Sequence, residues 1–133
     1  PGPRARWGGM LQVASIGAYQ PSPHYAAYSA AKSYVRSFSQ ALNFELRGSG
    51  VSCTSLCPGI TATEFLQVSG QKPTAYQRLM MMTSADVAAI GVKAMLAGRY
   101  SVVPGFLNWL TSLFTMVTPD PVNAAMAYRL MKN

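Results

Sequence analysis

The chain has 133 residues, of which half are hydrophobic and only 11% are charged. This length and composition indicate one folded domain and argue against a disordered chain. The net charge of +7 could favour an anionic partner, but the eleven basic residues are scattered and no two are adjacent, so nucleic-acid binding is not expected. His24 is the only histidine, which excludes a metal site built from several histidines.

The first elements expected along the chain are a strand and a long helix. Gly9 to Ser15 is a short apolar run that ends in small polar residues, as is typical of a buried strand. Ser22 before Pro23 predicts a helix start, and the helix is expected to run to about Arg47, where the glycines of residues 48–50 stop it. One buried stripe of this helix is expected to contain Val35, Phe38, Leu42 and Leu46.

The second half of the chain continues the alternation of strands and helices. Residues 51–59, "VSCTSLCPG", are small and apolar throughout, which suits a parallel strand that is covered on both faces. Residues 60–83 have weak periodicity and predict an irregular or partly helical excursion. Ser84 then predicts the cap of a helix through about Ala97, and "YSVVPG" at residues 100–105 predicts a third strand. The alternation predicts an α/β fold with a parallel sheet of about three strands and flanking helices.

The apolar segment at residues 106–117, "FLNWLTSLFTMV", is expected to form a helix, with a last short helix after "TPDP". It is shorter than the roughly 20 residues that a membrane span requires, so no transmembrane segment is expected. Ordinary packing against the sheet is the expected role. The alternatives are that the segment lines an apolar pocket, contacts a membrane surface or forms part of a subunit interface.

The two cysteines, Cys53 and Cys57, lie in the second predicted strand. They would share one face of the strand but stand too far apart to form a disulfide. They are therefore expected to be reduced core residues in a reducing compartment. The amino terminus "PGPRARWGGM" has no apolar stretch, so no signal peptide is expected and the predicted location is cytoplasmic.

The stretch "YSAAK" places Tyr28 and Lys32 four residues apart, on one face of the predicted helix. A lysine ammonium one turn away lowers the pKa of a phenol, which is ordinarily about 10, so the tyrosine could exchange a proton near neutral pH. Ser15 could hold the same substrate oxygen by a hydrogen bond, because both sites lie toward the carboxyl ends of the strands. Such a group suits reversible carbonyl–alcohol chemistry with hydride from a cofactor. Taken alone, the pair could also be a core tyrosine and a solvated lysine.

These residues resemble the active site of the short-chain dehydrogenases/reductases. The family's Tyr-x-x-x-Lys is matched by Tyr28 and Lys32, and its serine, thirteen positions before the tyrosine, by Ser15. After the next strand the family carries Pro-Gly-x-x-x-Thr, whose residues flank the nicotinamide. The matching residues here are Pro58, Gly59 and Thr63.

The resemblance implies an NAD(P)-dependent oxidoreductase that interconverts a carbonyl and a secondary alcohol on a partial doubly wound, Rossmann-like sheet. It implies that Tyr28 exchanges the proton and that Lys32 lowers its pKa and binds the nicotinamide ribose. Ser15 would position the substrate oxygen. The implied cofactor is NAD or NADP, the implied substrate is a small carbonyl compound or alcohol, and the complete enzyme is expected to be a homo-oligomer.

The family's Gly-x-x-x-Gly-x-Gly turn, which holds the cofactor's pyrophosphate, has no match in this sequence, and neither has the asparagine of its catalytic tetrad. Residues 1–133 therefore resemble the carboxyl-terminal half of such an enzyme, a single truncated Rossmann-like domain. One alternative is an inactive fragment that no longer binds cofactor. Another is a membrane-surface or interaction module that uses the basic charge and the apolar segment at residues 106–117.

Overall fold

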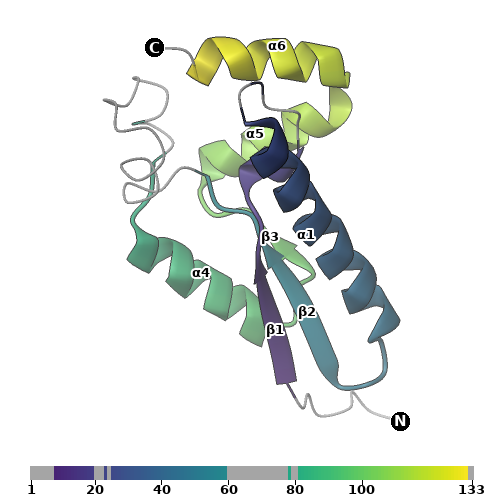
Figure 1. The fold of residues 1–133 in the computed structure, drawn as a ribbon. Coiled ribbons are helices and arrows are strands. Elements are labelled where there is room, and N and C mark those ends of the chain that lie inside the picture. Colours follow the sequence, from purple (N-terminus) through teal and green to yellow (C-terminus); the bar gives the residue numbers. More distant parts are fainter. Residues whose placement is uncertain (1–7, 20–22, 24, 60–77, 79–80, 132–133) are drawn as a thin grey trace.

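The computed structural model describes residues 8–19, 23, 25–59, 78 and 81–131 (Figure 1). Three parallel strands form one sheet in the order β1-β2-β3. They are β1 (Gly8–Val13), β2 (Val51–Leu56) and β3 (Ser101–Val102). The register of the first pair runs from Gly8 opposite Val51 to Val13 opposite Leu56. The predicted parallel α/β sheet of three strands is confirmed.

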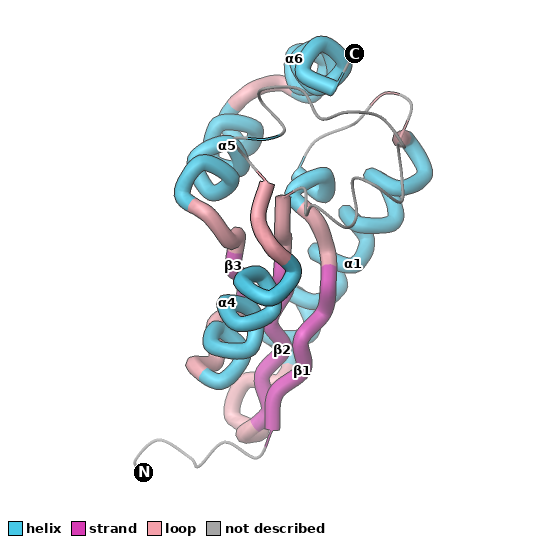
Figure 2. The backbone as a smooth tube through the Cα atoms, turned by 90° about the vertical axis from the view of Figure 1, so that its left-hand side faces the viewer, coloured by secondary structure: helices cyan, strands magenta, loops and turns pink. Residues whose placement is uncertain are grey.

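Helices cover both faces of the sheet and its carboxyl end. Helix α1 (Ala26–Glu45) lies on one face and α4 (Ser84–Leu96) on the other (Figures 1 and 2). The short 3₁₀ helix η1 (Ile16–Tyr19) follows β1, and α5 (Phe106–Val117) packs against it. Helix α6 (Asp120–Met131) lies outside α5, beyond the carboxyl ends of the strands (Figure 1).

The two faces of the sheet are packed differently. On the α4 face, a side chain at Gly91 would come within 2.8 Å of Leu56 Cδ2, so this glycine lets the helix approach the apolar strand residues closely. On the α1 face the contacts are small and polar. Ser39 Oγ lies 3.3 Å from Cys53 Sγ, and Asn43 Oδ1 accepts the Cys53 backbone N–H at 2.8 Å.

The predicted start and stripe of the first helix are wrong in detail. Helix α1 begins at Ala26, its N-cap is Tyr25, and that cap forms no side-chain hydrogen bond. The predicted cap, Ser22, lies outside the described residues. Phe38 is 50% exposed, whereas Ser39 is fully buried, because the close packing of α1 on β2 leaves room only for small side chains.

Two later elements also differ from the prediction. Thr83, and not Ser84, caps α4, since its Oγ1 accepts the Asp86 backbone N–H at 3.2 Å. The third strand has only two residues in place of the predicted six-residue run. Helix α4 ends at Leu96, close to the predicted Ala97, and Gly98 follows with a left-handed φ of 73°.

The apolar helix α5 does not pack as expected. Its buried residues are the polar Asn108, Ser112 and Thr115, and it contacts η1 at the carboxyl end of the sheet. Its apolar side chains face outward. Within the described residues, the structure contains no helix of the length and hydropathy that crossing a membrane demands.

Candidate active site

The carboxyl ends of β1 and β2 bring the first site residues side by side. The Ala14 N–H donates to Leu56 O at 2.7 Å, and the Ile16 N–H donates to Pro58 O at 2.9 Å. These bonds continue the parallel pairing beyond the strands themselves. Ser15 is therefore held beside the Cys57–Pro58 segment, as the sequence predicts for the ends of neighbouring parallel strands.

Ser15 is buried and takes part in the turn that follows β1. Its Oγ accepts the Gly17 N–H at 3.1 Å, and its carbonyl oxygen accepts the Ala18 N–H at 2.9 Å, which starts η1. In the first of these bonds the hydroxyl serves as acceptor. Its own proton therefore remains available for donation to another oxygen.

Two serines of α1 fasten the helix to η1. Ser29 Oγ donates to Gly17 O and Ser33 Oγ donates to Ala18 O, both at 2.9 Å. Ser29 is the serine of "YSAAK" and is buried. The small residues of this motif thus permit a close contact with η1 and fix the position of the first two helical turns.

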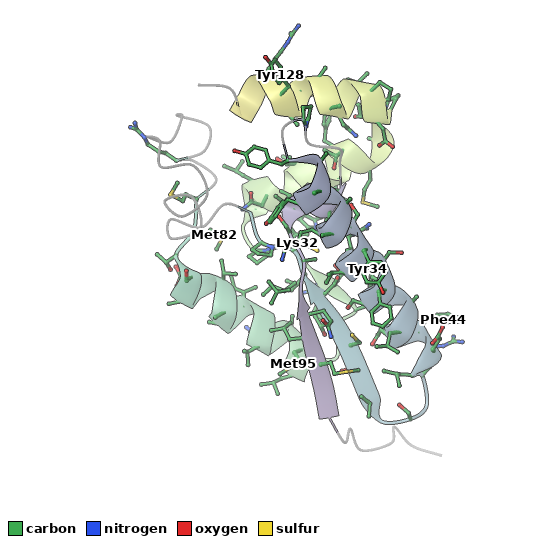
Figure 3. The ribbon with its side chains drawn as sticks, in the orientation of Figure 1. Lys32, Tyr34, Phe44, Met82, Met95 and Tyr128 are labelled. Carbon is green, nitrogen blue, oxygen red and sulfur yellow. The ribbon has the colours of Figure 1, made fainter. Side chains whose placement is uncertain are left out.

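Tyr28 and Lys32 share the site with Ser15. A side chain at Gly17 would lie 3.5 Å from Ser15 Oγ and 3.8 Å from Tyr28 Cε1, so the hydroxyl and the phenol ring flank the same glycine. Lys32 Nζ lies 5.7 Å from the centroid of the Tyr28 ring and donates to Val13 O at 3.2 Å. Figure 3 places Lys32 at the carboxyl ends of the strands, between the two helical layers. All three predicted residues meet at this end of the sheet.

The predicted nicotinamide-flanking residues are only partly described. Pro58 contacts the site through its hydrogen bond with Ile16. Gly59 packs against the side chain of Asn108 on α5, where an added Cβ would come within 2.7 Å of Asn108 Cγ. Thr63 lies outside the described residues, as does His24.

Sequence reasoning missed two positions of this site. Gly17 separates Ser15 from Tyr28, and Asn108 supports Gly59 from α5 while donating to Pro104 O at 3.1 Å. The only signal for Asn108 was a polar residue within an apolar segment. That signal predicts neither a direction nor a partner.

A polar cluster joins α1, η1 and the residue that follows β2. The Arg36 guanidinium stacks on Tyr19, with Cζ 3.9 Å from the ring centroid. Burial raises the pKa of the Cys57 thiol above its ordinary value, while a hydrogen bond from Ser55 acts in the opposite direction.

Both cysteines, Cys53 and Cys57, are free and buried, as predicted. The described part of the chain contains no group of histidine, cysteine and acidic residues that could hold a metal ion.

Comparison with known sequences gives related proteins that extend well beyond this chain. A family model described as short chain dehydrogenase matches residues 3–74, more than half of the chain. An uncharacterized oxidoreductase of Myxococcus xanthus is 28% identical over 123 residues, which cover 92% of this chain and 47% of that protein. Sulfoacetaldehyde reductase of Chromohalobacter salexigens is 34% identical over 84 residues, 59% of this chain and 33% of that protein. The chain thus spans about half the length of these relatives, or less.

Solved structures show the same architecture. A 7beta-hydroxysteroid dehydrogenase superposes with a TM-score of 0.72 at 16% identity, covering 90% of this chain and 47% of that one. A short chain dehydrogenase from Burkholderia cenocepacia J2315, solved in complex with NADP, superposes with a TM-score of 0.67 at 20% identity, covering 94% and 48%. These likenesses confirm the partial Rossmann-like fold.

Proposed function

The chain belongs to the short-chain dehydrogenase family, and on that premise we propose that it forms part of an NAD(P)-dependent oxidoreductase that interconverts a carbonyl and a secondary alcohol. The observation that carries this proposal is the grouping of Ser15, Tyr28 and Lys32 around the carboxyl end of β1. The substrate class is a small carbonyl compound or alcohol.

Each of the three residues has a role that its surroundings support. Tyr28 gives a proton to the carbonyl oxygen during reduction and takes it back during oxidation. Lys32, with its ammonium 5.7 Å from the centroid of the Tyr28 ring, stabilises the phenolate form of that side chain. Ser15 donates its hydroxyl proton to the same substrate oxygen, because its Oγ is held in place by the Gly17 N–H.

The implied cofactor, NAD or NADP, would be held by Tyr28, Lys32, Pro58, Gly59 and Thr63. The four of these that are described fit its nicotinamide end, because they lie at the carboxyl ends of parallel strands, where dinucleotides bind. When bound, the cofactor supplies or accepts the hydride. The Burkholderia cenocepacia neighbour was solved with NADP, which supports a nicotinamide cofactor here. The sequence has no Gly-x-x-x-Gly-x-Gly turn, so these 133 residues do not supply the usual pyrophosphate site.

The proposed compartment is the cytoplasm. Cys53 and Cys57 are free and buried, which supports a reducing environment. A homo-oligomer is the proposed state of the complete enzyme. The support for it is the aromatic outer face of α1, where Tyr34 and Phe38 stack with ring centroids 5.9 Å apart.

The test of the proton-transfer role is Tyr28→Phe in a full-length enzyme that contains this sequence. Removal of the hydroxyl should lower kcat by about 10²- to 10⁴-fold and leave cofactor affinity nearly unchanged. Tyr34→Phe is the matched control, since Tyr34 lies on the same helix with its ring exposed, and it should retain normal turnover. Near-normal kcat in Tyr28→Phe would contradict the assigned role.

A fluorescence titration tests whether these 133 residues bind the cofactor by themselves. The isolated 133-residue chain should bind NAD(H) and NADP(H) no better than millimolar, because the pyrophosphate site is not among its residues. Micromolar binding by this chain would contradict that account of the cofactor site.

A further inference from the structure

Gly17 lies in η1, between the two hydroxyl-bearing residues of the site. An added Cβ at this position would lie 3.5 Å from Ser15 Oγ and 3.8 Å from Tyr28 Cε1. Outside η1 itself, no other atom of the described residues comes within 4 Å of that point. Tyr28 is 37% exposed and Gly17 is half-buried, so the described residues do not seal this space. The space beside Gly17 is therefore bounded by the two groups proposed to bind the substrate oxygen.

The backbone at Gly17 does not itself require a glycine. Its φ lies outside the left-handed region that favours glycine, in contrast to the φ of 86° at Gly105. Alanine also adopts a helical backbone more readily than glycine does. The distances of 3.5 and 3.8 Å are ordinary van der Waals contacts. An alanine at this position would therefore fit the fold, and what it would change is the space in front of Ser15 and Tyr28.

The backbone of Gly17 is held on both sides by hydrogen bonds. Its N–H donates to Ser15 Oγ at 3.1 Å, and its carbonyl oxygen accepts Ser29 Oγ at 2.9 Å. The next carbonyl of η1, at Ala18, accepts Ser33 Oγ at 2.9 Å. A shift of η1 away from the site would break these bonds. An added methyl group would therefore stay in the space beside Ser15 and Tyr28 and reduce the room for a substrate.

We propose that Gly17 is a specificity-determining residue that admits the second carbon substituent of a ketone. This proposal rests on the proposed oxidoreductase function and narrows its substrate class to ketones and the corresponding secondary alcohols. When Ser15 Oγ and the Tyr28 hydroxyl bind the substrate oxygen, the carbonyl carbon lies beside both groups, and one of its two substituents lies against Gly17. An aldehyde can place its hydrogen there, whereas a ketone must place a carbon.

The test compares propanal with diethyl ketone as substrates of a full-length enzyme that contains this sequence. The two compounds share an ethyl group on the carbonyl carbon and differ only in the second substituent. Gly17→Ala should lower kcat/KM for diethyl ketone by about tenfold or more beyond any loss for propanal, the discrimination that one added carbon produces in a pocket. Gly8→Ala is the matched control, because an added Cβ there meets no atom within 4 Å, and it should leave the ratio unchanged.

Urea unfolding of the same variants separates specificity from stability. Gly17→Ala should unfold at the same urea concentration as the unaltered enzyme, and a lower midpoint would show that the fold, and not the substrate, needs the glycine. Equal losses for propanal and diethyl ketone would overturn the proposal, as would an unaltered enzyme that reduces propanal and leaves diethyl ketone untouched. An unaltered enzyme that reduces neither compound would instead contradict the oxidoreductase function itself, and this inference would fall with it.

Discussion

Gly59 occupies a position that has no room for a side chain. An added Cβ would lie 2.6 Å from Asn108 Nδ2 and 2.7 Å from its Cγ. Asn108 is 3% exposed and is held by its bond to Pro104 O, so it cannot turn away freely. We expect Gly59→Ala to lower the free energy of unfolding by about 1–3 kcal/mol, the usual cost of overpacking.

Urea unfolding of the purified chain measures this effect, with Gly8→Ala as the matched control. Gly8 lies at the start of β1, and an added Cβ there meets no atom within 4 Å. The control should therefore unfold at nearly the same urea concentration as the unaltered chain. If both variants unfold alike, Asn108 does not restrict the space at Gly59.

The same residues illustrate what the sequence can predict about the site. The grouping of Ser15, Tyr28 and Lys32 at one end of the sheet could be predicted, because their spacing and their place near the ends of strands can be read from the sequence. Gly17 and Asn108 were not found. Asn108 reaches Gly59 from a helix that begins 47 residues later, and a contact of that kind depends on how the helix packs rather than on any local pattern.

At the scale of the elements, the N-cap residue of α4 differs between the structure and the sequence-based prediction. Ser84 and Thr83 are both good N-cap residues, so composition alone does not choose between them. In the structure Thr83 has extended backbone angles and its Oγ1 accepts the Asp86 N–H. We expect Thr83→Ala to lower the free energy of unfolding by about 1 kcal/mol.

Ser84→Ala is the control for this cap, because Ser84 is already inside the helix, where alanine is the better helix former. Thermal unfolding followed by circular dichroism should place Ser84→Ala at or above the unaltered chain and Thr83→Ala below it. If Ser84→Ala instead unfolds at a lower temperature than Thr83→Ala, Ser84 is the N-cap residue.

The prediction that Phe38 lies on the buried face of α1 is wrong for a physical reason. Periodicity favoured Phe38 as a core residue, but the helix packs so closely on β2 that the fully buried position is Ser39, against Cys53. Hydrophobic periodicity assumes that the interior is apolar. Here a small hydroxyl and a thiol fill the interior, and α5 departs from the same assumption.

Across the whole molecule, apolar surface is left exposed at several places at once. Phe38 on α1, Phe114 on α5 and Val13 on β1 are each about half exposed. The order of strands and helices was predictable, because the alternation of strand-like and helix-like segments and the glycines that end helices can be read from the sequence. The distribution of exposed surface was not predictable, since it depends on which elements remain without a neighbour.

The edge of the sheet gives the prediction that belongs to this scale. Strand β1 pairs with β2 on one side, and no other strand in the described residues pairs with its second side. Its sequence, "GGMLQV", carries no charge. Natural edge strands are usually protected by charge, proline or a covering element, and β1 contains no proline either. We therefore expect the isolated 133-residue chain to associate with itself.

Size-exclusion chromatography with light scattering checks this expectation, and a lysine on the edge tests its cause. Gln12→Lys places a charge at a half-buried position of the unpaired strand and should shift the chain toward the monomer, because two such edges would then repel. Gln40→Lys makes the same chemical change on α1, away from the edge, and should leave the association unchanged. If the unaltered chain elutes as a monomer, or if both lysine variants dissociate equally, the open side of β1 is not the surface through which the chain associates.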